Sequence, residues 1–390
     1  MATAYNILIC LLALQKVSEL PNYIQVRKEP CSITICMDKR MKERNYHENL
    51  NIENTKKLRE LIKELPPYVA TYFRGIEHTT APRTRIAYAI DLRTFFEFIH
   101  QTNPLYQEKE IRNFEFDLLT KLESTDIEEY LDYLKLYTKD GKEYTNDERG
   151  IKRKLAALRS FYGYFHKNKM INENPILQVS MPKLHDKAIV RLDVDEVATL
   201  LDTVESGNKL TDKQQAFHSK TKERDLAIMT LLLGTGIRVS ECVGLDRKDV
   251  DFNNTRIKIT RKGGYEAYVY FGEEVTAALQ DYLVLRNEIP AATGHEDALF
   301  LSIQKKRMGV RSIELLVKKY SSTVTTMKKI TPHKLRSTYG TSLYRETGDI
   351  YLVADVLGHK DVNTTKKHYA AIEEERRRSV KDAVRLRDTK

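Results

Sequence analysis

Apolar residues recur every three or four positions in several stretches of the first half of the chain, which is the spacing of one helix face. The stretches are 52–65, 83–99, 126–137 and 151–165. We expect Thr125 to cap the third, with Glu128 three residues later as in a capping box. Pro66-Pro67 and Asn174-Pro175 interrupt the pattern, because a residue before proline disfavours helix. Several helices with short links predict a compact bundle.

The second half of the chain predicts more helices and one small sheet. Helical spacing covers 192–204, 224–236, 273–286 and 310–320. Within 249–271, alternating apolar residues flank the turn signals Asn253-Asn254 and Gly263-Gly264, which predicts an antiparallel sheet. We expect a loop at the polar stretch 205–222 and a short strand at 298–302. The expected fold class is therefore mainly α, with a helical bundle and a mostly helical second part that carries a small antiparallel sheet.

A short helix is expected to begin near residue 331. Thr331 suits the N-cap, and Pro332 suits the first helical position because its missing N–H would be unpaired there anyway. His333 and Arg336 are three residues apart and therefore lie on one face of this helix.

Two more short helices are expected after it. Gly358 suits a helix stop, because glycine adopts the left-handed conformation at little cost, and His359 follows it. Asn363 is expected to cap the next helix, which carries Tyr369. The charged tail 373–390 has a few apolar residues at helical spacing, and is either a frayed end or a docking helix.

The length of 390 residues corresponds to two or three domains. We expect an N-terminal extension at 1–65, a helical domain at 66–182, a polar linker at 183–191 and a second domain at 192–390. The apolar run at 4–14 is too short to span a bilayer and lacks the basic start of a secretory signal. The extension is read either as a small accessory domain or as sequence upstream of the natural start.

The formal net charge is +10 and the pI is about 9.1. A basic balance favours an anionic partner, most often nucleic acid, although ribosomal and membrane-surface proteins share it. The four cysteines are few and irregularly spaced, at positions 10, 31, 36 and 242. No paired Cys-x-x-Cys set is present, so we expect reduced thiols in the cytoplasm and no zinc site.

Two arginines suit the chemistry of a phosphodiester, whose charge repels nucleophiles. Arg238, in T-G-I-R-V-S-E, and Arg336 can each bind a non-bridging oxygen through paired hydrogen bonds. They would neutralise the charge that develops in the pentavalent state. Glu241 is expected to orient an arginine or a histidine.

Other polar residues are candidates for the nucleophile, the general base and the general acid. Tyr369 carries a phenol, which has a pKa near 10 and needs a base or a positive field to react at neutral pH. His333 and His359 can supply either, and Lys262, in T-R-K-G-G, can protonate the leaving sugar oxygen. Each role is filled, so we expect no metal or other cofactor.

In order, these motifs resemble those of the tyrosine site-specific recombinases of the phage integrase and Xer type. The matching segments are T-G-I-R-V-S-E-C-V-G-L (235–245), R-K-G-G-Y-E-A-Y-V-Y (261–270), H-K-L-R-S-T-Y (333–339), L-G-H (357–359) and T-T-K-K-H-Y (364–369). The resemblance covers about 66–390. One departure is Tyr265, where many relatives carry a second basic residue.

The resemblance implies a helical DNA-clamp domain followed by a catalytic domain, and metal- and ATP-independent recombination through a 3′-phosphotyrosine. It also implies double-stranded DNA with specific sites as the partner, a homotetramer on two such sites, and accessory DNA-bending or directionality proteins. Integration and excision of a mobile element are expected. The alternatives are Xer-like dimer resolution, type IB topoisomerase-like relaxation, and a DNA-binding protein that has lost its activity.

In a domain of this kind, basic residues on helices are candidates for contact with DNA phosphates, which position the protein without reading sequence. The candidates are Arg83, Arg85, Lys152, Arg153, Lys154 and Arg159. The competing interpretation is an ordinary solvated helix face. No residue that reads base edges could be chosen from the sequence.

Overall fold

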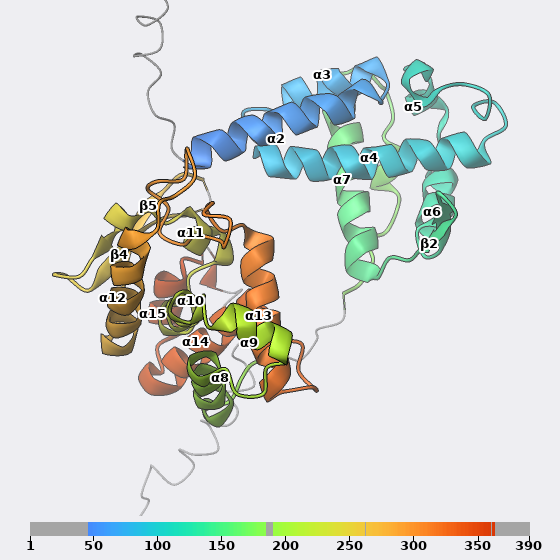
Figure 1. Cartoon of the computed structure of the whole chain (residues 1–390). Coiled ribbons are helices and arrows are strands. Elements are labelled where there is room, and N and C mark those ends of the chain that lie inside the picture. The colour runs from blue at the N-terminus through green and yellow to red at the C-terminus, as the bar shows by residue number, and fades with distance from the viewer. Residues whose placement is uncertain (1–45, 185–189, 262, 360, 363–390) are drawn as a thin grey trace, which may run out of the picture. The chain divides into compact units, whose positions relative to one another are not determined.

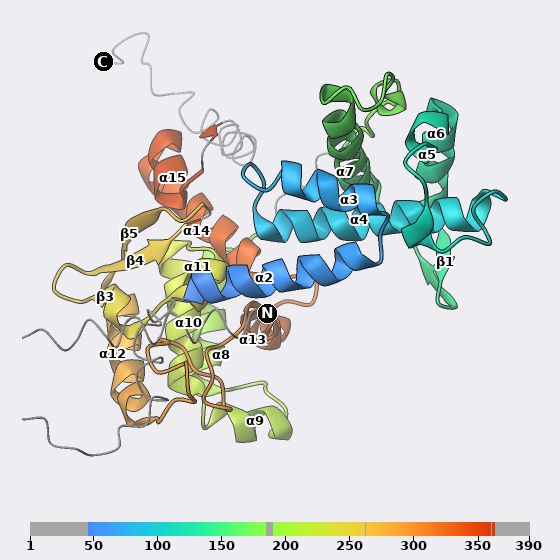
Figure 2. The ribbon, with the colours of Figure 1, turned by 90° about the horizontal axis from the view of Figure 1, so that it is seen from above.

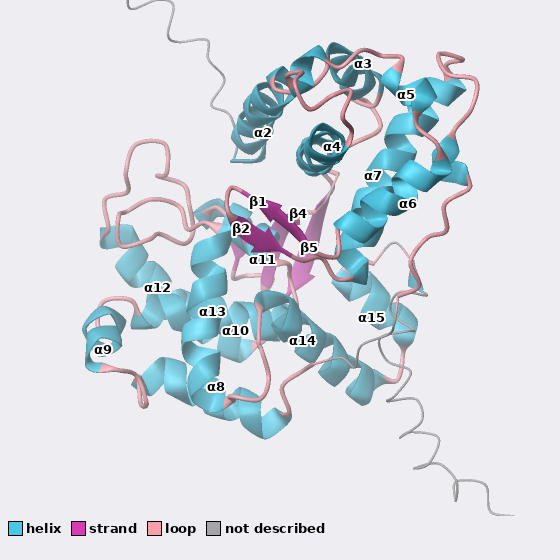
Figure 3. Ribbon diagram, turned by 90° about the vertical axis from the view of Figure 1, so that its right-hand side faces the viewer, coloured by secondary structure: helices cyan, strands magenta, loops and turns pink. Residues whose placement is uncertain are grey.

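The computed structural model describes residues 46–184, 190–261, 263–359 and 361–362. The chain divides into two compact units, 1–48 and 49–390, and only Tyr46–Glu48 of the first are described. Helices dominate, and the described strands form two small antiparallel sheets, which confirms the expected fold class (Figure 3). None of the helices described is both long and apolar enough to cross a membrane.

The first part of the described chain is a helical bundle (Figure 1). Its helices are α2 (Tyr46–Lys63), α3 (Pro67–Gly75), α4 (Pro82–Thr102), α5 (Leu118–Lys121), α6 (Ser124–Tyr133) and α7 (Glu148–Lys167), with 3-10 turns at Ile111–Asn113 and Pro175–Leu177. Helix α4 packs against α7, and aromatic side chains fill the space between the helices. Fully buried rings include Tyr72, Phe95, Phe96, Phe161 and Phe165. Leu58 of α2 joins this core although it lies in the expected N-terminal extension.

A short hairpin follows α6 where the sequence had predicted continuous helix to residue 137. Strand β1 (Tyr137–Lys139) pairs with β2 (Lys142–Tyr144). Asp140 (φ 51°) and Gly141 (φ 70°) form its two-residue turn, and Asp-Gly is a strong hairpin signal because both residues tolerate positive φ. The predicted cap was also wrong, because Glu123 and Asp126 form the capping box in place of Thr125 and Glu128.

The second part of the described chain consists mainly of helices around α10. Its helices are α8 (Val194–Ser206), α9 (Asp212–His218), α10 (Lys222–Thr235), α11 (Val239–Gly244), α12 (Glu273–Glu288), α13 (Val310–Val324), α14 (Pro332–Thr347) and α15 (Ile350–Leu357), with a 3-10 turn at Arg247–Asp249. Helix α10 packs against α8, α12 and α14. The loop predicted at 205–222 is wrong in part, because α9 forms there with a capping box between Thr211 and Gln214.

The predicted antiparallel sheet is confirmed. Strands β3 (Val250–Asp251), β4 (Arg256–Thr260) and β5 (Glu266–Tyr270) pair in the order β3-β4-β5. The strand predicted at 298–302 is not formed, and only isolated bridges occur at Ala298 and Leu301. The β4–β5 hairpin turn contains the Lys262 position, which lies outside the described residues.

Candidate active site

Arg238 lies at the N-terminus of α11, immediately after α10 has ended. The left-handed Gly236 (φ 62°) ends α10, and Arg238 is the N-cap residue of α11. Glu241 accepts a hydrogen bond from the Arg238 backbone N–H (2.8 Å) and another from its Nη1 (2.8 Å). Glu241 is buried, so this carboxylate fixes both the backbone and the side chain of an arginine that is 35% exposed.

Arg336 is a buried cation in the first turns of α14, with 5% of its surface exposed. Its Nη1 donates to the carbonyl of Gly236 (2.6 Å), and its Nη2 donates to the carbonyl of Leu357. One guanidinium thus joins the end of α10 to the end of α15. His333 lies one turn earlier on the same helix and is exposed. The helix begins where it was predicted to begin, with Thr331 at the N-cap and Pro332 at the first helical position.

His359 follows the left-handed residue Gly358 (φ 64°), which ends α15 as predicted. The His359 backbone N–H donates to the carbonyl of Ala354 (2.9 Å), and the Gly358 N–H donates to that of Asp355 (2.8 Å). This pair is the pattern of a Schellman-type helix end. The Gly358 carbonyl in turn accepts a hydrogen bond from Arg238 Nη2 (3.3 Å).

The structure therefore brings Arg238, Arg336 and His359 together at the C-terminal end of α15, although they are separated by up to 121 positions in the chain. Two guanidiniums, one held by neutral carbonyls and one by a carbonyl and the Glu241 carboxylate, are suited to binding a phosphate. Lys262 and Tyr369 lie outside the described residues, as do the cap at Asn363 and the tail. The roles of all six residues stay predictions.

Arg261, the neighbour of Lys262, also lies at this site, although its sequence pattern did not mark it as a candidate. Its Nη2 donates to the carbonyl of Val356 (3.1 Å), and its Nη1 lies 3.5 Å from that of Asp355. The β4–β5 hairpin therefore contacts the end of α15, and the two elements lie side by side in Figure 2.

The candidate phosphate contacts in the bundle differ in burial and in their hydrogen-bond partners. Arg85 is buried and pairs with Glu77 (2.9 Å). Lys154 is buried and pairs with the buried Asp91 (3.2 Å), to which Arg153 also donates.

The expectation that Lys154 forms part of an exposed basic face is therefore wrong, since a buried charge is tolerated only with a partner. Arg159 donates to the carbonyl of Val179 (2.6 Å). Arg83 and Arg153 are exposed, and Lys152 and Arg159 are half-buried. Of these four, Arg153 and Arg159 already donate to Asp91 and to the Val179 carbonyl.

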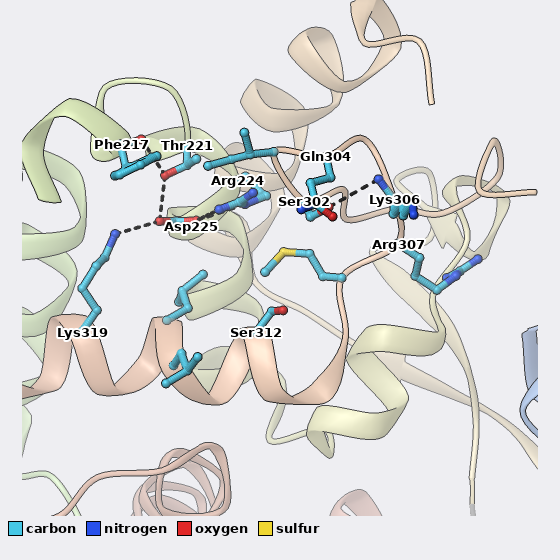
Figure 4. A pocket seen from close by; sticks show the side chains of 14 residues that line it. Phe217, Thr221, Arg224, Asp225, Ser302, Gln304, Lys306, Arg307, Ser312 and Lys319 are labelled. Carbon is cyan, nitrogen blue, oxygen red and sulfur yellow. Dashed lines mark hydrogen bonds and ion pairs between the residues drawn. The ribbon is translucent and has the colours of Figure 1, made fainter. Parts of the chain in front are cut away.

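A cavity of about 610 Å³ lies away from the arginine pair, between α9, α10, α13 and the segment 302–308 (Figure 4). Three of its charged groups pair with one another, because Asp225 accepts from Arg224 (2.6 Å) and Lys319 (3.2 Å). Burial lowers the pKa of Lys319, although the nearby Asp225 opposes this. The cavity rim carries exposed apolar side chains, including Phe217, Ile303 and Leu315. These features suit an apolar partner better than a charged substrate.

Cys242 lies on α11 beside Glu241 and is a free, buried cysteine. Burial raises the pKa of its thiol to about 12. The thiol therefore stays protonated at neutral pH and is a poor nucleophile.

The sequence of this chain is similar to those of known proteins. Residues 190–376 match the phage integrase family. The chain is 33% identical over 304 residues to tyrosine recombinase XerC of Caldanaerobacter subterraneus subsp. tengcongensis, which covers 76% of this chain and 79% of that protein. It is 30% identical over 357 residues to tyrosine recombinase XerS of Lactococcus lactis subsp. cremoris, covering 84% and 98%. Among solved structures, the Tn1549 transposon integrase in complex with circular intermediate DNA has a TM-score of 0.53 at 21% identity, covering 76% and 93%.

Proposed function

Because the chain belongs to the phage integrase family of tyrosine recombinases, which cleave and rejoin DNA strands at specific sites, we propose that Tyr369 is its nucleophile. The phenolic oxygen bonds to the scissile phosphorus while the bond to the 5′-oxygen breaks, which leaves a 3′-phosphotyrosine. His333 and His359 assist this attack, and Lys262 gives a proton to the departing 5′-oxygen. The phosphodiester is conserved as a protein ester, so the reaction needs no ATP.

The observation that supports this proposal is the convergence of Arg238 and Arg336 at the end of α15. Two preorganised guanidiniums can bind the non-bridging oxygens and stabilise the charge of the pentavalent state without reorganising during the reaction. Glu241 keeps Arg238 in place through two hydrogen bonds.

Rejoining follows the same path in reverse. The 5′-hydroxyl of a partner strand attacks the phosphotyrosine, and two such rounds pass through a four-way junction. Holding the strands in place contributes much of the rate, because intramolecular geometry alone can supply about 7–11 kcal/mol.

The test of this assignment is a covalent adduct on nicked duplexes built from DNA that flanks the gene, with a chelator present. We expect a protein–DNA adduct on a denaturing gel, and the mapped nick gives the site. Exchange of strands between two duplexes, as opposed to relaxation of one, separates a recombinase from a type IB topoisomerase. Binding without any adduct, on DNA recovered from the protein's own genomic sites, would contradict the assignment.

We further propose that the bundle acts as a DNA-clamp domain and residues 192–390 as the catalytic domain, joined by the linker 183–191. The net charge of +10 supports a polyanionic partner. Arg83, Lys152 and the exposed Arg153, which also pairs with Asp91, remain accessible candidates for phosphate contacts in the bundle.

Affinity for DNA is expected to fall steeply with salt, with a slope of about −0.9 per phosphate contact on a logarithmic plot. Arg83→Ala and Lys152→Ala should each reduce that slope by about one contact. Lys121→Ala is the matched control, because Lys121 is an exposed bundle cation already paired with Asp117 (2.6 Å). Titrations across a salt series measure the slopes, and a flat dependence would contradict the clamp.

For assembly we propose a homotetramer on two DNA sites, in which the tail 373–390 docks on a neighbouring subunit. The cavity in Figure 4 supports this, because its rim exposes Phe217 (50%), Ile303 (59%) and Leu315 (49%). The tail offers a small set of apolar residues at helical spacing, Val380, Ala383, Val384 and Leu386. Head-to-tail contacts of this kind close into rings.

Leu315→Glu is expected to leave binding to a single site unchanged and to weaken two-site complexes about tenfold or more. Removing one apolar docking contact costs about 1.5–3 kcal/mol, and 1.4 kcal/mol is a factor of ten. Val284→Glu, at an exposed position of α12, is the control. Native gels with one-site and two-site DNA give the comparison, and equal effects of both substitutions would contradict docking at this cavity.

The biological use we propose is integration and excision of a mobile element, with an accessory DNA-bending or directionality protein, in the cytoplasm. Resolution of chromosome or plasmid dimers is the second candidate. It is favoured by the alignment with XerS, which extends over 98% of that protein. Identifying the natural sites separates the two, because element ends and a single chromosomal site are distinct targets.

A further inference from the structure

The end of α15 shows a pattern that the six proposed catalytic residues do not account for. Four consecutive carbonyls, those of residues 355–358, accept hydrogen bonds from three arginines of different elements. Arg261 reaches Asp355 and Val356, Arg336 reaches Leu357, and Arg238 reaches Gly358. Carbonyls in the last turn of a helix lack the regular intrahelical donor, and here the Asp355 carbonyl also accepts from the Gly358 N–H (2.8 Å). This end of the helix carries the negative part of the helix dipole. Cationic donors therefore stabilise it.

Arg261 is the member of this trio with no proposed part in the chemistry. Its backbone closes the β4–β5 turn, because its N–H donates to the Tyr265 carbonyl (2.7 Å) and its own carbonyl accepts from Gly264 N–H (3.0 Å). Its side chain leaves the turn and packs directly on Gly358. A Cβ at position 358 would lie 1.6 Å from Arg261 Nη1. The φ of 64° favours glycine there, and a Cβ at this position would in addition displace the Arg261 guanidinium.

We propose that Arg261 is a positioning residue for strand cleavage. It fixes the last turn of α15, so that the carbonyls of Leu357 and Gly358 hold the guanidiniums of Arg336 and Arg238 at the spacing that a phosphate requires. The inference rests on the proposed phosphate-binding roles of those two arginines.

The physical reason is that catalysis tolerates little displacement of the groups that stabilise the transition state. Without Arg261, two carbonyls of the final turn lose their side-chain donor and the space beside Gly358 opens. A helix end held by fewer bonds shifts more readily, and its remaining carbonyls carry Arg336 and Arg238 with them. A misplacement of about 1 Å at such a site can cost about 10²-fold in rate.

The first test compares Arg261→Ala with the unchanged chain in single-turnover cleavage of a nicked duplex. We expect cleavage to slow by about 10- to 100-fold, with DNA affinity nearly unchanged. Lys258→Ala is the matched control, because Lys258 lies on the same hairpin and pairs with Glu266 (3.2 Å). Its rate should stay within about twofold of that of the unchanged chain, since the expected cost of losing a surface ion pair is small.

A second substrate separates positioning from a loss of folded protein. A methylphosphonate at the scissile position has a methyl group in place of one non-bridging oxygen and carries no negative charge. Stabilisation by guanidiniums matters less there, so the deficit of Arg261→Ala should shrink several-fold. A deficit of equal size on both substrates would overturn the inference. So would a deficit that disappears when the 5′-leaving oxygen is replaced by sulfur, because the effect would then act on the leaving group.

A double substitution tests the contact itself. Gly358→Ala should be impaired, because alanine is strained at a φ of 64° and its Cβ would displace the Arg261 guanidinium. Removing the guanidinium relieves that clash, so Arg261→Ala combined with Gly358→Ala should lose less than the product of the two single effects. Independent effects that multiply would overturn the inference, as would full activity of Arg261→Ala. Failure of the unchanged chain to form an adduct would instead count against the proposed function.

Discussion

Replacing Tyr369 by phenylalanine is expected to abolish the covalent protein–DNA adduct while binding to DNA persists. The substitution removes a single oxygen, the atom that bonds to phosphorus in the proposed mechanism. Loss of a catalytic nucleophile can cost on the order of 10⁶-fold in rate, which is below detection in a gel assay. The measurement is adduct formation on a nicked duplex with chelator present, together with a binding titration.

The control for that substitution is Tyr351→Phe. Tyr351 lies on α15 and is 70% exposed, so its hydroxyl is accessible without a proposed role, and its loss should leave adduct yield unchanged. An adduct that persists in Tyr369→Phe would assign the nucleophile to another residue. A biological effect that persists without any adduct would favour a protein that binds DNA and no longer cuts it.

Arg336→Lys is expected to slow cleavage by about 10²–10³-fold although the charge is kept. Losing one donor to a transition-state oxyanion costs about this much. Lysine has a single ammonium group, which cannot reproduce the planar fork that joins Gly236 O, Leu357 O and a phosphate oxygen. Single-turnover rates on a nicked duplex, normalised to the folded fraction from thermal melts, measure the effect.

Arg286→Lys provides the matched comparison. Arg286 is also a buried arginine, 2% exposed, and it donates to the carbonyls of Ala298 (3.0 Å), Glu296 (2.8 Å) and Ile289 (3.3 Å). Its replacement should lower the melting temperature without changing the rate per folded molecule. If both substitutions changed only stability, the role of Arg336 in charge stabilisation would be contradicted.

The local chemistry of glycine and proline made the site region predictable from sequence. Pro332 begins α14, and Gly236 and Gly358 end α10 and α15 in the left-handed conformation. Periodicity likewise predicted the long helices and the β3–β5 sheet. These features depend on residues within one turn of each other, so a sequence window contains the information.

Other features depend on tertiary contacts and were missed. Lys154 lies in a basic stretch that is typical of a solvated helix face, yet it is buried and donates to Asp91, 63 positions away. The role of Arg261 depends on carbonyls more than 90 positions later in the chain, and no local pattern marks an acceptor on the backbone. The β1–β2 hairpin is a different case, because Asp140-Gly141 is a local turn signal that lies directly after a stretch with helical periodicity.

The hydrogen bonds at the end of α15 also determine at what point in synthesis the arginines of the site can be positioned. Arg238 and Arg261 leave the ribosome about a hundred residues before the carbonyls that hold them, and Arg336 about twenty before. A nascent chain, or a fragment cut before Gly358, therefore has the cations without the backbone that arranges them. Such a chain can still adhere to DNA through its charge. On the proposed roles of these arginines, the site is completed only after residue 358 has been made and folded. We therefore expect a chain that ends before this residue to bind DNA without cleaving it.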